Sequence, residues 1–330
     1  MEYLLGIIVL LVKIAVMLIG LLLAASYLVW LERKLLARLQ IRLGPNRAGI
    51  FGLLQPIADA IKLLCKEDTM PAEADPLIFR LAPAVVAVTA MLMFAVVPLG
   101  PDFRVMGRPV PLLISDLNVG LLYVFALSSL GVYGVALGGW ASNSKFALLG
   151  GIRGAAQMIS YELALGLSLV PVVMLTGSLS LTAIVDAQAR TPFIVLQPVS
   201  FIIFLISAMA ESKRIPFDLP EAENELGAGF HTEYSGMRFG LYFLGEYVHI
   251  QVLGALIAVF FLGGWHGPWL PPVVWLLLKI FFVAVIMIWV RGTLPRLRYD
   301  QLMALGWKVL IPAALINIVL TAVFMQVAMT

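Results

Sequence analysis

Charged side chains are scarce in this sequence of 330 residues, where Asp, Glu, Lys and Arg together account for 12%. Hydrophobic residues account for 62%, whereas the apolar share of a soluble globular domain is about 45–50%. The composition therefore excludes a soluble globular protein. The formal net charge of +3 is small, and it does not indicate nucleic-acid binding.

Cysteine and histidine are almost absent. Cys65 is the only cysteine, so the chain can form neither an internal disulfide nor a cysteine-held iron–sulfur cluster of its own. The three histidines, His231, His249 and His266, have no metal-ligand spacing, and no metal site is predicted. The sequence also contains no Walker loop, no Gly-x-Gly-x-x-Gly turn of a βαβ unit and no His-Glu-x-x-His zinc motif. A nucleotide-binding or hydrolytic enzyme acting alone is therefore not supported.

Long apolar runs are what the sequence has in abundance. Runs of about 20 apolar residues predict membrane-spanning helices, and the spans leave no room for a soluble domain. We therefore predict an all-α integral membrane protein that forms a single polytopic domain over residues 1–330. The first run is too long for a cleaved signal peptide, so we expect it to be retained as a span. Eight spans are predicted, the fifth of them short, at about residues 4–30, 80–98, 119–140, 159–176, 196–210, 240–262, 273–290 and 309–328.

Basic residues are unevenly distributed between the predicted connections, and this predicts the orientation of the chain. Connections after odd-numbered spans hold 16 of the Lys and Arg residues, and those after even-numbered spans hold 3. Cytoplasmic loops of membrane proteins carry the excess of Lys and Arg. We therefore expect the odd connections in the cytoplasm and both termini on the outer side.

A short amphipathic helix is predicted over residues 50–66, after the Gly44-Pro45-Asn46 turn. Its apolar and polar residues occupy opposite helical faces, at spacings of three and four. Such a helix is too short and too polar to cross a membrane, so we expect it on the cytoplasmic surface. Two roles are open for it: it rests on lipid head groups, or it frames a lateral opening from the lipid phase.

The densest group of charges is an acidic loop predicted at residues 211–238, on the cytoplasmic side. Five carboxylates fall within fifteen residues there. Ionisable groups beside hydrocarbon are costly and are functional candidates by default. Crowded carboxylates in a low-dielectric setting cannot all ionise readily, so some of their pKa values rise. We therefore expect protons, cations or a polar head group to be handled by Glu211, Asp218, Glu221, Glu223 and Glu225.

Four further ionisable residues lie in or beside predicted spans. Glu246 lies about seven residues into its span, roughly 10 Å along a helix axis, which favours a paired or functional buried role. Glu162 lies at the start of its span, either as an acid stabilised by the helix N-terminus or as a group in a polar cavity. Lys13 and Lys279 lie inside the first and seventh spans, as partners of buried acids or as members of a proton path.

Seven motifs follow one another between about residues 26 and 310. They are Glu32-Arg33-Lys34, Arg42-Leu-Gly44-Pro45-Asn46-Arg47, Gln55-Pro56-Ile-Ala58-Asp59-Ala60-Ile-Lys62-Leu, Ser160-Tyr161-Glu162, Glu211-Ser-Lys213-Arg214-Ile-Pro216-Phe217-Asp218-Leu-Pro220-Glu221-Ala-Glu223, Gly245-Glu246-Tyr247 and Pro295-Arg296-Leu-Arg298-Tyr299-Asp300-Gln301-Leu-Met303. Together they resemble the H-subunit family of bacterial proton-pumping NADH–quinone oxidoreductase (respiratory complex I), equivalent to the first mitochondrially encoded subunit. Residues 1–25 and 311–330 carry no motif and match only as spans.

The resemblance implies a role in the bacterial inner membrane, at the heel of the membrane arm. There the chain would form the membrane side of a quinone chamber and begin a proton path toward antiporter-like subunits. Flavin and iron–sulfur clusters would lie on partner subunits of the peripheral arm, and quinone and membrane lipid would be further partners. For the proton path or its coupling, the resemblance implies Glu162, Glu211, Asp218, Glu221, Glu223, Glu225 and Glu246. For the quinone site, it implies Arg33, Arg42, Arg47, Asp59, Phe217, Arg291, Arg296, Arg298 and Asp300.

Two other functions compete with this interpretation. The first is the homologous membrane anchor of a membrane-bound hydrogenase or a formate-oxidising complex, which would share the fold and differ in its electron-carrying partners. The second is a stand-alone ion or solute transporter. The spans show no internal repeat of the kind that many transporters have, which argues against the second function.

Overall fold

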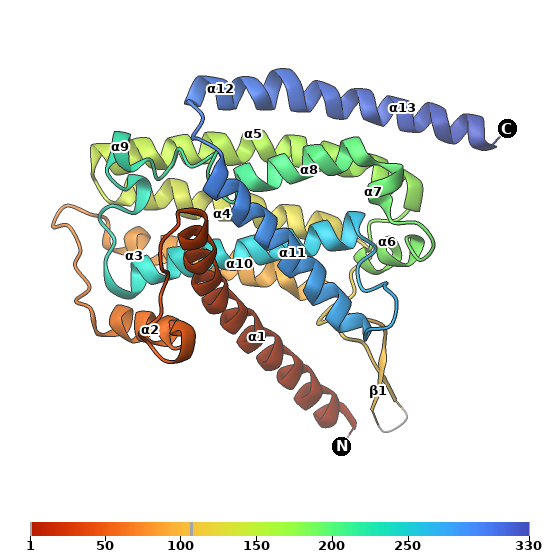
Figure 1. Ribbon diagram of the computed structural model, residues 1–330, viewed down its shortest axis with the longest axis horizontal. Coiled ribbons are helices and arrows are strands. Elements are labelled where there is room, and N and C mark those ends of the chain that lie inside the picture. Colours follow the sequence, from red (N-terminus) through yellow and green to blue (C-terminus); the bar gives the residue numbers. More distant parts are fainter. Residues whose placement is uncertain (1, 106–107, 330) are drawn as a thin grey trace.

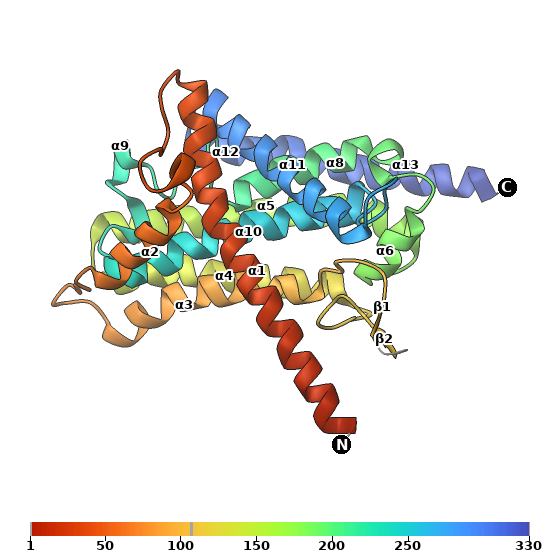
Figure 2. The same cartoon turned by 60° about the horizontal axis from the view of Figure 1, so that its bottom comes forward.

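A computed structural model describes the backbone of residues 2–105 and 108–329 and the side chains of residues 6–102, 111–222 and 225–327. Most of its long helices lie side by side in one bundle, from which the N-terminal helix diverges, and a small β-hairpin lies at one end (Figures 1 and 2). The long helices are α1 (Glu2–Leu39), α3 (Pro76–Met93), α4 (Gly120–Ala141), α5 (Lys145–Thr176), α10 (Gly236–Phe261), α11 (Pro272–Thr293) and α13 (Ile311–Met329).

Shorter elements connect these helices. The hairpin pairs strands β1 (Phe103–Val105) and β2 (Arg108–Val110) in antiparallel register. A π-helical turn, Leu305–Leu310, joins α12 to α13 into one continuous rod. The short helices are α2 (Gln55–Cys65), α6 (Leu181–Ala187), α7 (Phe193–Leu196), α8 (Pro198–Glu211), α9 (Glu223–Leu226) and α12 (Tyr299–Ala304), with 3₁₀ turns at Ile50–Gly52, Phe94–Val96 and Gly229–His231.

The chain is an all-α membrane protein. In the part of the chain that the structure describes, seven helical segments are long and apolar enough to cross a membrane. The fifth predicted span corresponds to α8, which has 14 residues and is therefore about 21 Å long. That length is shorter than the roughly 30 Å of a hydrocarbon core, so α8 alone does not meet the length of a full crossing.

Several helices extend beyond the predicted spans. Helix α1 continues to Leu39, past the Glu32-Arg33-Lys34 cluster, and α5 begins at Lys145 rather than near residue 159. The apolar run ends where the hydrocarbon is expected to end, but the helix continues beyond it because its backbone hydrogen bonds do not depend on lipid. As a result Glu162 lies near the middle of α5, and the helix-terminus interpretation of this acid is wrong.

Helix α10 lies in the centre of the bundle. Of its most apolar stretch, 78% is buried, whereas the corresponding figure for α1 is 6%. It packs against α3, α11 and α1, while α4 packs between α3 and α5. Glycines permit the close approach of α4 to α10: a Cβ on Gly138 would lie 2.0 Å from the Tyr242 hydroxyl. That hydroxyl donates to the carbonyl of Gly134 at 3.1 Å.

The amphipathic helix is shorter than predicted. It begins at Gln55, because Phe51 and Gly52 have φ angles of 54° and 78° that interrupt the helical path. Ile57 and Ile61 on its apolar face are more than half exposed. Helix α2 therefore presents an apolar stripe outward, beside α1 (Figure 1).

Candidate functional site

The segment after α8, residues 212–222, carries two of the predicted acids, Asp218 and Glu221, into the bundle. Gln157 of α5 holds both sides of this segment, donating at 2.7 Å to the carbonyls of Ala210 and Phe217. The carbonyl of Pro216 accepts from the backbone N–H of Leu297 at 3.0 Å. Since these contacts come from two different parts of the chain, the segment has a fixed path, and its charges lie at defined positions.

One charge cluster joins α1, α11 and the segment. Glu32 of α1 is 3% exposed and accepts from Arg214 at 3.1 and 3.3 Å. It also forms an ion pair with Arg291 of α11. The Arg214 guanidinium lies 4.4 Å from the centre of the Tyr247 ring. Buried charges persist when they are paired in this way.

A second charge cluster lies between the segment and α10. The Lys213 ammonium is 3.2 Å from the carboxylate of Glu246, and both side chains are largely buried. Burial, and after it the charge of Glu246, raises the pKa of Glu221 well above its usual value. Glu221 and Glu246 are thus close acids in different electrostatic settings, since Lys213 favours the ionised form of Glu246.

Asp218 and Arg296 form a third pair, between the segment and the connection before α12. Their charged atoms are 3.1 Å apart. Burial raises the pKa of Asp218 to about 6, although the Arg296 guanidinium acts in the opposite direction. The carboxyl group therefore changes its charge near neutral pH, which is the range in which a proton carrier works.

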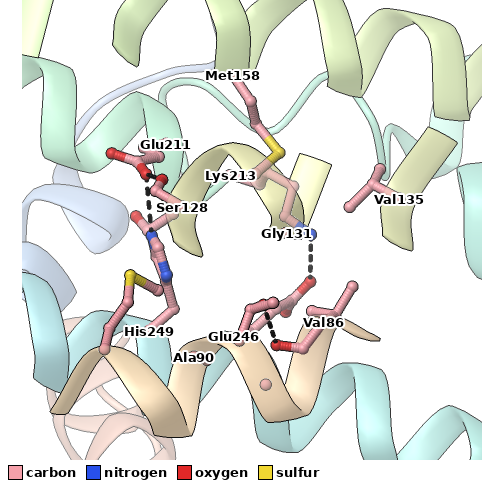
Figure 3. A pocket seen from close by; sticks show the side chains of 14 residues that line it. Val86, Ala90, Ser128, Gly131, Val135, Met158, Glu211, Lys213, Glu246 and His249 are labelled. Carbon is pink, nitrogen blue, oxygen red and sulfur yellow. Dashed lines mark hydrogen bonds and ion pairs between the residues drawn. The ribbon is translucent and has the colours of Figure 1, made fainter. Parts of the chain in front are cut away.

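Two consecutive serines of α4 connect two further acids. Ser128 donates to Glu211 at the end of α8, and Ser129 donates to Glu162 of α5 at 2.5 Å. Consecutive helical residues point about 100° apart, so the two acids contact different sides of α4. The Nε2 atom of His249 on α10 lies 3.6 Å from the carboxylate of Glu211, and the two side chains point toward each other in Figure 3.

A small cavity joins the second cluster to Glu211. Glu211, Lys213, Glu246 and His249 all line it, together with Ser128 (Figure 3). Its volume is about 30 Å³, which is enough for one or two water molecules. Titratable groups from α8, α10 and the segment after α8 thus face one polar space inside the bundle.

The remaining predicted residues lie apart from these clusters. Arg33 pairs with Asp59 and so links α1 to α2. Phe217 is buried, with its ring centre 5.5 Å from that of Tyr161. The others lie at the surface. Glu225 pairs with Arg153, Arg298 pairs with Asp300, and Arg42 donates to Gln40. Arg47 is also exposed. The side chain of Glu223 lies outside the described residues.

The two lysines within spans lack acidic partners among the described residues. Lys279 of α11 donates to the carbonyls of Leu262, Gly264 and His266 at 2.7 to 2.8 Å. It therefore holds the last carbonyls of α10 and the following loop, as a cation at a helix C-terminus does. Lys13 of α1 makes neither an ion pair nor a hydrogen bond with the described part of the chain.

Sequence reasoning missed four residues of the site. In the sequence Glu32 is only one member of a motif, and Ser128 and Ser129 resemble ordinary small residues of a span. His249 has no metal-ligand spacing that would single it out. The available signal was its position three residues after Glu246, which places both on one face of α10. Among the described residues, no group of three or more His, Cys, Asp or Glu side chains has a metal-binding arrangement.

Comparisons with known proteins agree on one family along nearly the whole chain. The model of the family described as NADH dehydrogenase matches residues 12–322. The chain is 74% identical to the NADH-quinone oxidoreductase H subunit numbered 2 in Syntrophobacter fumaroxidans, over 96% of each chain. It is 66% identical to the H subunit numbered 1 in Geobacter metallireducens, over 94% of each, and 60% identical to the H subunit of Syntrophotalea carbinolica, over 98% of each.

Proposed function

Since the chain belongs to the NADH dehydrogenase family, we propose that it is the H subunit of a proton-pumping NADH–quinone oxidoreductase of the bacterial inner membrane. It has no activity alone and works only with the other subunits of the complex. Partner subunits of the peripheral arm carry the flavin and the iron–sulfur clusters that bring electrons from NADH. Antiporter-like membrane subunits lie on its other side.

One observation carries this proposal: buried and partly buried ionisable groups follow one another from the end of α1 to the middle of α5. The cluster of Glu32, Arg214 and Arg291 comes first. Glu221, Glu246 and Lys213 follow, and the cavity joins them to Glu211. The serines of α4 then lead to Glu162. Such a row of ionisable groups inside a membrane protein is the form that proton relays take.

The first part of this row bounds the quinone chamber. Quinone reduction consumes two electrons and two protons, so negative charge develops at the quinone until protons arrive. Arg291 and Arg296 are cations at this end of the bundle, each paired with a carboxylate. An anion that approaches them competes with those carboxylates and shifts their pKa values. Asp218 responds most directly, because its pKa of about 6 lies near the operating pH.

The second part of the row exchanges protons in response to the change of charge at the quinone. Burial, and after it the charge of Glu246, raises the pKa of Glu221 and so favours its protonated form, while the carboxylate of Glu246 is paired with Lys213. A proton that leaves Glu221 for the chamber leaves a second negative charge beside Glu246, and a proton from the cavity side replaces it. Water in the cavity links this exchange to Glu211 and His249. A change of charge at Glu211 then acts electrostatically on Glu162, on the other side of α4.

Identification of the partners tests the assignment. The chain is purified from native membranes in mild detergent, and the proteins that remain with it are identified. Peripheral-arm subunits together with NADH-dependent quinone reduction are expected. Recovery with a hydrogenase or with formate-oxidising subunits would instead establish the alternative anchor function. All three relatives described above are named as NADH-quinone oxidoreductase subunits, which favours the first outcome.

A further inference from the structure

The loop between α10 and α11, residues 262–271, carries the most exposed large apolar side chain among the described residues. Trp269 is 101% exposed, and Leu270 beside it is 46% exposed. Trp269 also has a φ angle of 67°, which is an outlier for a bulky residue. Such a backbone conformation persists only where the surrounding structure imposes it, and it often marks a functional position.

Side chains from two helices hold the backbone of this loop. Lys279 of α11 donates to three carbonyls in the first half of the loop, at 2.7 to 2.8 Å. The indole N–H of Trp275, also on α11, donates to the carbonyl of Pro268 at 2.7 Å. Gln188, directly after α6, accepts from the backbone N–H of Gly263 at 3.0 Å. The loop therefore has a fixed path, and the exposed indole has a fixed place on it.

The position of the loop in the chain places this indole close to the membrane surface. Both α10 and α11 are long and apolar enough to cross a membrane. The loop between them lies at the end of the bundle where α6 and the β-hairpin lie, opposite the acidic segment (Figure 1). Trp269 precedes Pro272, the first residue of α11, by three positions. Three residues of extended chain span at most about 11 Å, so Trp269 lies within that distance of the start of a crossing helix.

The exposed pair is also continuous with exposed apolar side chains of α11. Val274, Leu277 and Phe281 are 38%, 52% and 52% exposed, and their spacing of three and four places them on one face of the helix. Trp269 and Leu270 stand directly before this face, where hydrocarbon gives way to head groups. An indole suits that region, because its ring is apolar and its N–H donates to polar oxygens, and tryptophan is enriched there. The surface that fits this loop is therefore a lipid surface.

We propose that this loop is a membrane anchor, in which Trp269 enters the head-group region of the adjacent leaflet and its N–H donates to a phospholipid oxygen. The distribution of basic residues predicts that this is the outer leaflet. Interfacial tryptophans set the tilt and rotation of the helices that carry them, so the anchor fixes the position of α10 and α11 in the membrane. The inference goes beyond the proposed function and does not depend on it, since its readout is a lipid contact rather than quinone chemistry.

A photoreactive side chain identifies what covers the loop. Trp269→benzoylphenylalanine is introduced into the full chain, the assembly is irradiated in native membranes, and adducts of the chain are identified by mass spectrometry. We expect a phospholipid adduct. Asp102→benzoylphenylalanine is the matched control, because Asp102 is an exposed, charged residue at the same end of the bundle. We expect no phospholipid adduct from the control.

Two further variants separate an effect of lipid from an effect within the chain. Trp269→Tyr keeps an aromatic ring with a polar group, and Trp269→Asn removes the ring with a residue that tolerates a positive φ angle. The indole is fully exposed, so its loss removes no packing within the described chain, and relief of the backbone alone would stabilise Trp269→Asn. If the loop is an anchor, we expect the opposite: in phospholipid vesicles Trp269→Asn melts at a lower temperature than the wild type, and Trp269→Tyr melts at the wild-type temperature.

Three results would overturn the proposal. The first is an adduct between position 269 and a neighbouring protein subunit in place of a phospholipid, which would assign the loop to a protein interface. The second is a phospholipid adduct at position 102 as abundant as that at position 269. The third is a melting temperature of Trp269→Asn in vesicles that equals or exceeds that of the wild type.

Discussion

Arg214 and Glu32 are 182 positions apart in the sequence, yet one guanidinium nitrogen of Arg214 donates to both carboxylate oxygens of Glu32, at 3.1 and 3.3 Å. Both side chains are almost fully buried. Glu32 also pairs with Arg291, so a single carboxylate compensates two cations. The segment after α8 is thereby tied to α1 and α11 at the end of the bundle where the predicted quinone site lies.

Replacement of Glu32 by glutamine should therefore damage assembly. Glu32→Gln removes the carboxylate that pairs with both Arg214 and Arg291, and removal of one partner from a buried ion pair costs about 3–5 kcal/mol. We expect a lower yield of the assembled complex on native gels and a lower unfolding temperature. Asp300→Asn is the matched control, because its pair with Arg298 is exposed and contributes about 0–1 kcal/mol. Equal effects of the two variants would contradict the role of Glu32 as the shared partner of two cations, one of them buried.

The acids of the proposed relay should affect quinone chemistry without affecting electron entry. Glu211→Gln and Glu221→Gln keep the size of the side chain and remove its titratable charge. We expect both variants to assemble, to lose most quinone reductase activity, and to reduce an artificial acceptor on the peripheral arm at the wild-type rate. Loss of assembly would indicate a structural role instead. Full quinone reduction and proton pumping in the double variant would exclude both acids from the mechanism.

Asp218 should give quinone reduction a pH dependence centred near pH 6. Above its pKa of about 6, Asp218 is ionised and holds Arg296; below it, protonation releases the arginine. We expect activity to fall as the pH drops through 6, and Asp218→Asn to remove this step from the profile. The effect of Asp218 on stability runs opposite to its effect on activity. Because its pKa is raised in the folded state, the free energy of unfolding increases as the pH falls. Titration of Asp218 therefore does not unfold the complex in that range, and a melting curve at each pH separates the two effects.

The charge distribution predicts the topology of the whole chain. Reporter fusions after residues 70, 150, 225 and 300 should report the cytoplasm, and fusions after residues 108, 188 and 268 should report the outside. The basis is the count of 16 basic residues against 3. Two or more reversed reporters would mean that the predicted order of spans is wrong. Helix α8 is the weakest element of that order, because its 14 residues are too few to cross alone.

The sequence alone was sufficient to predict the class of fold, because an apolar run and a membrane crossing are limited by the same thickness of hydrocarbon. It was less informative about helix ends. The polar residues after Trp30 indicate where lipid ends, but α1 continues to Leu39, since its backbone is as well satisfied in water as in lipid. The same reasoning explains why α5 begins before its apolar run and why Glu162 was placed too near a helix end.

Pairing between charges could not be predicted from the sequence. Composition and spacing drew attention to the acidic loop, but Glu32 binds Arg291 across 259 positions, and no local pattern specifies such a contact. His249 and Ser128 were missed for the same reason: each residue is unremarkable on its own helix. They become part of a site only because α4, α8 and α10 bring them to one cavity.

The same long separation constrains the order in which the protein can be completed during its synthesis. Glu32 leaves the ribosome 259 residues before Arg291, an interval of roughly 10–50 s at typical rates of translation. Throughout that interval the acid has no partner on α11, and for most of it Arg214 has not been made either. The end of α1 must therefore remain in contact with water or head groups until α11 has entered the membrane. Closure of the bundle at that end is therefore a late event. If the end of α1 were buried earlier, the charge of Glu32 would be buried without a partner.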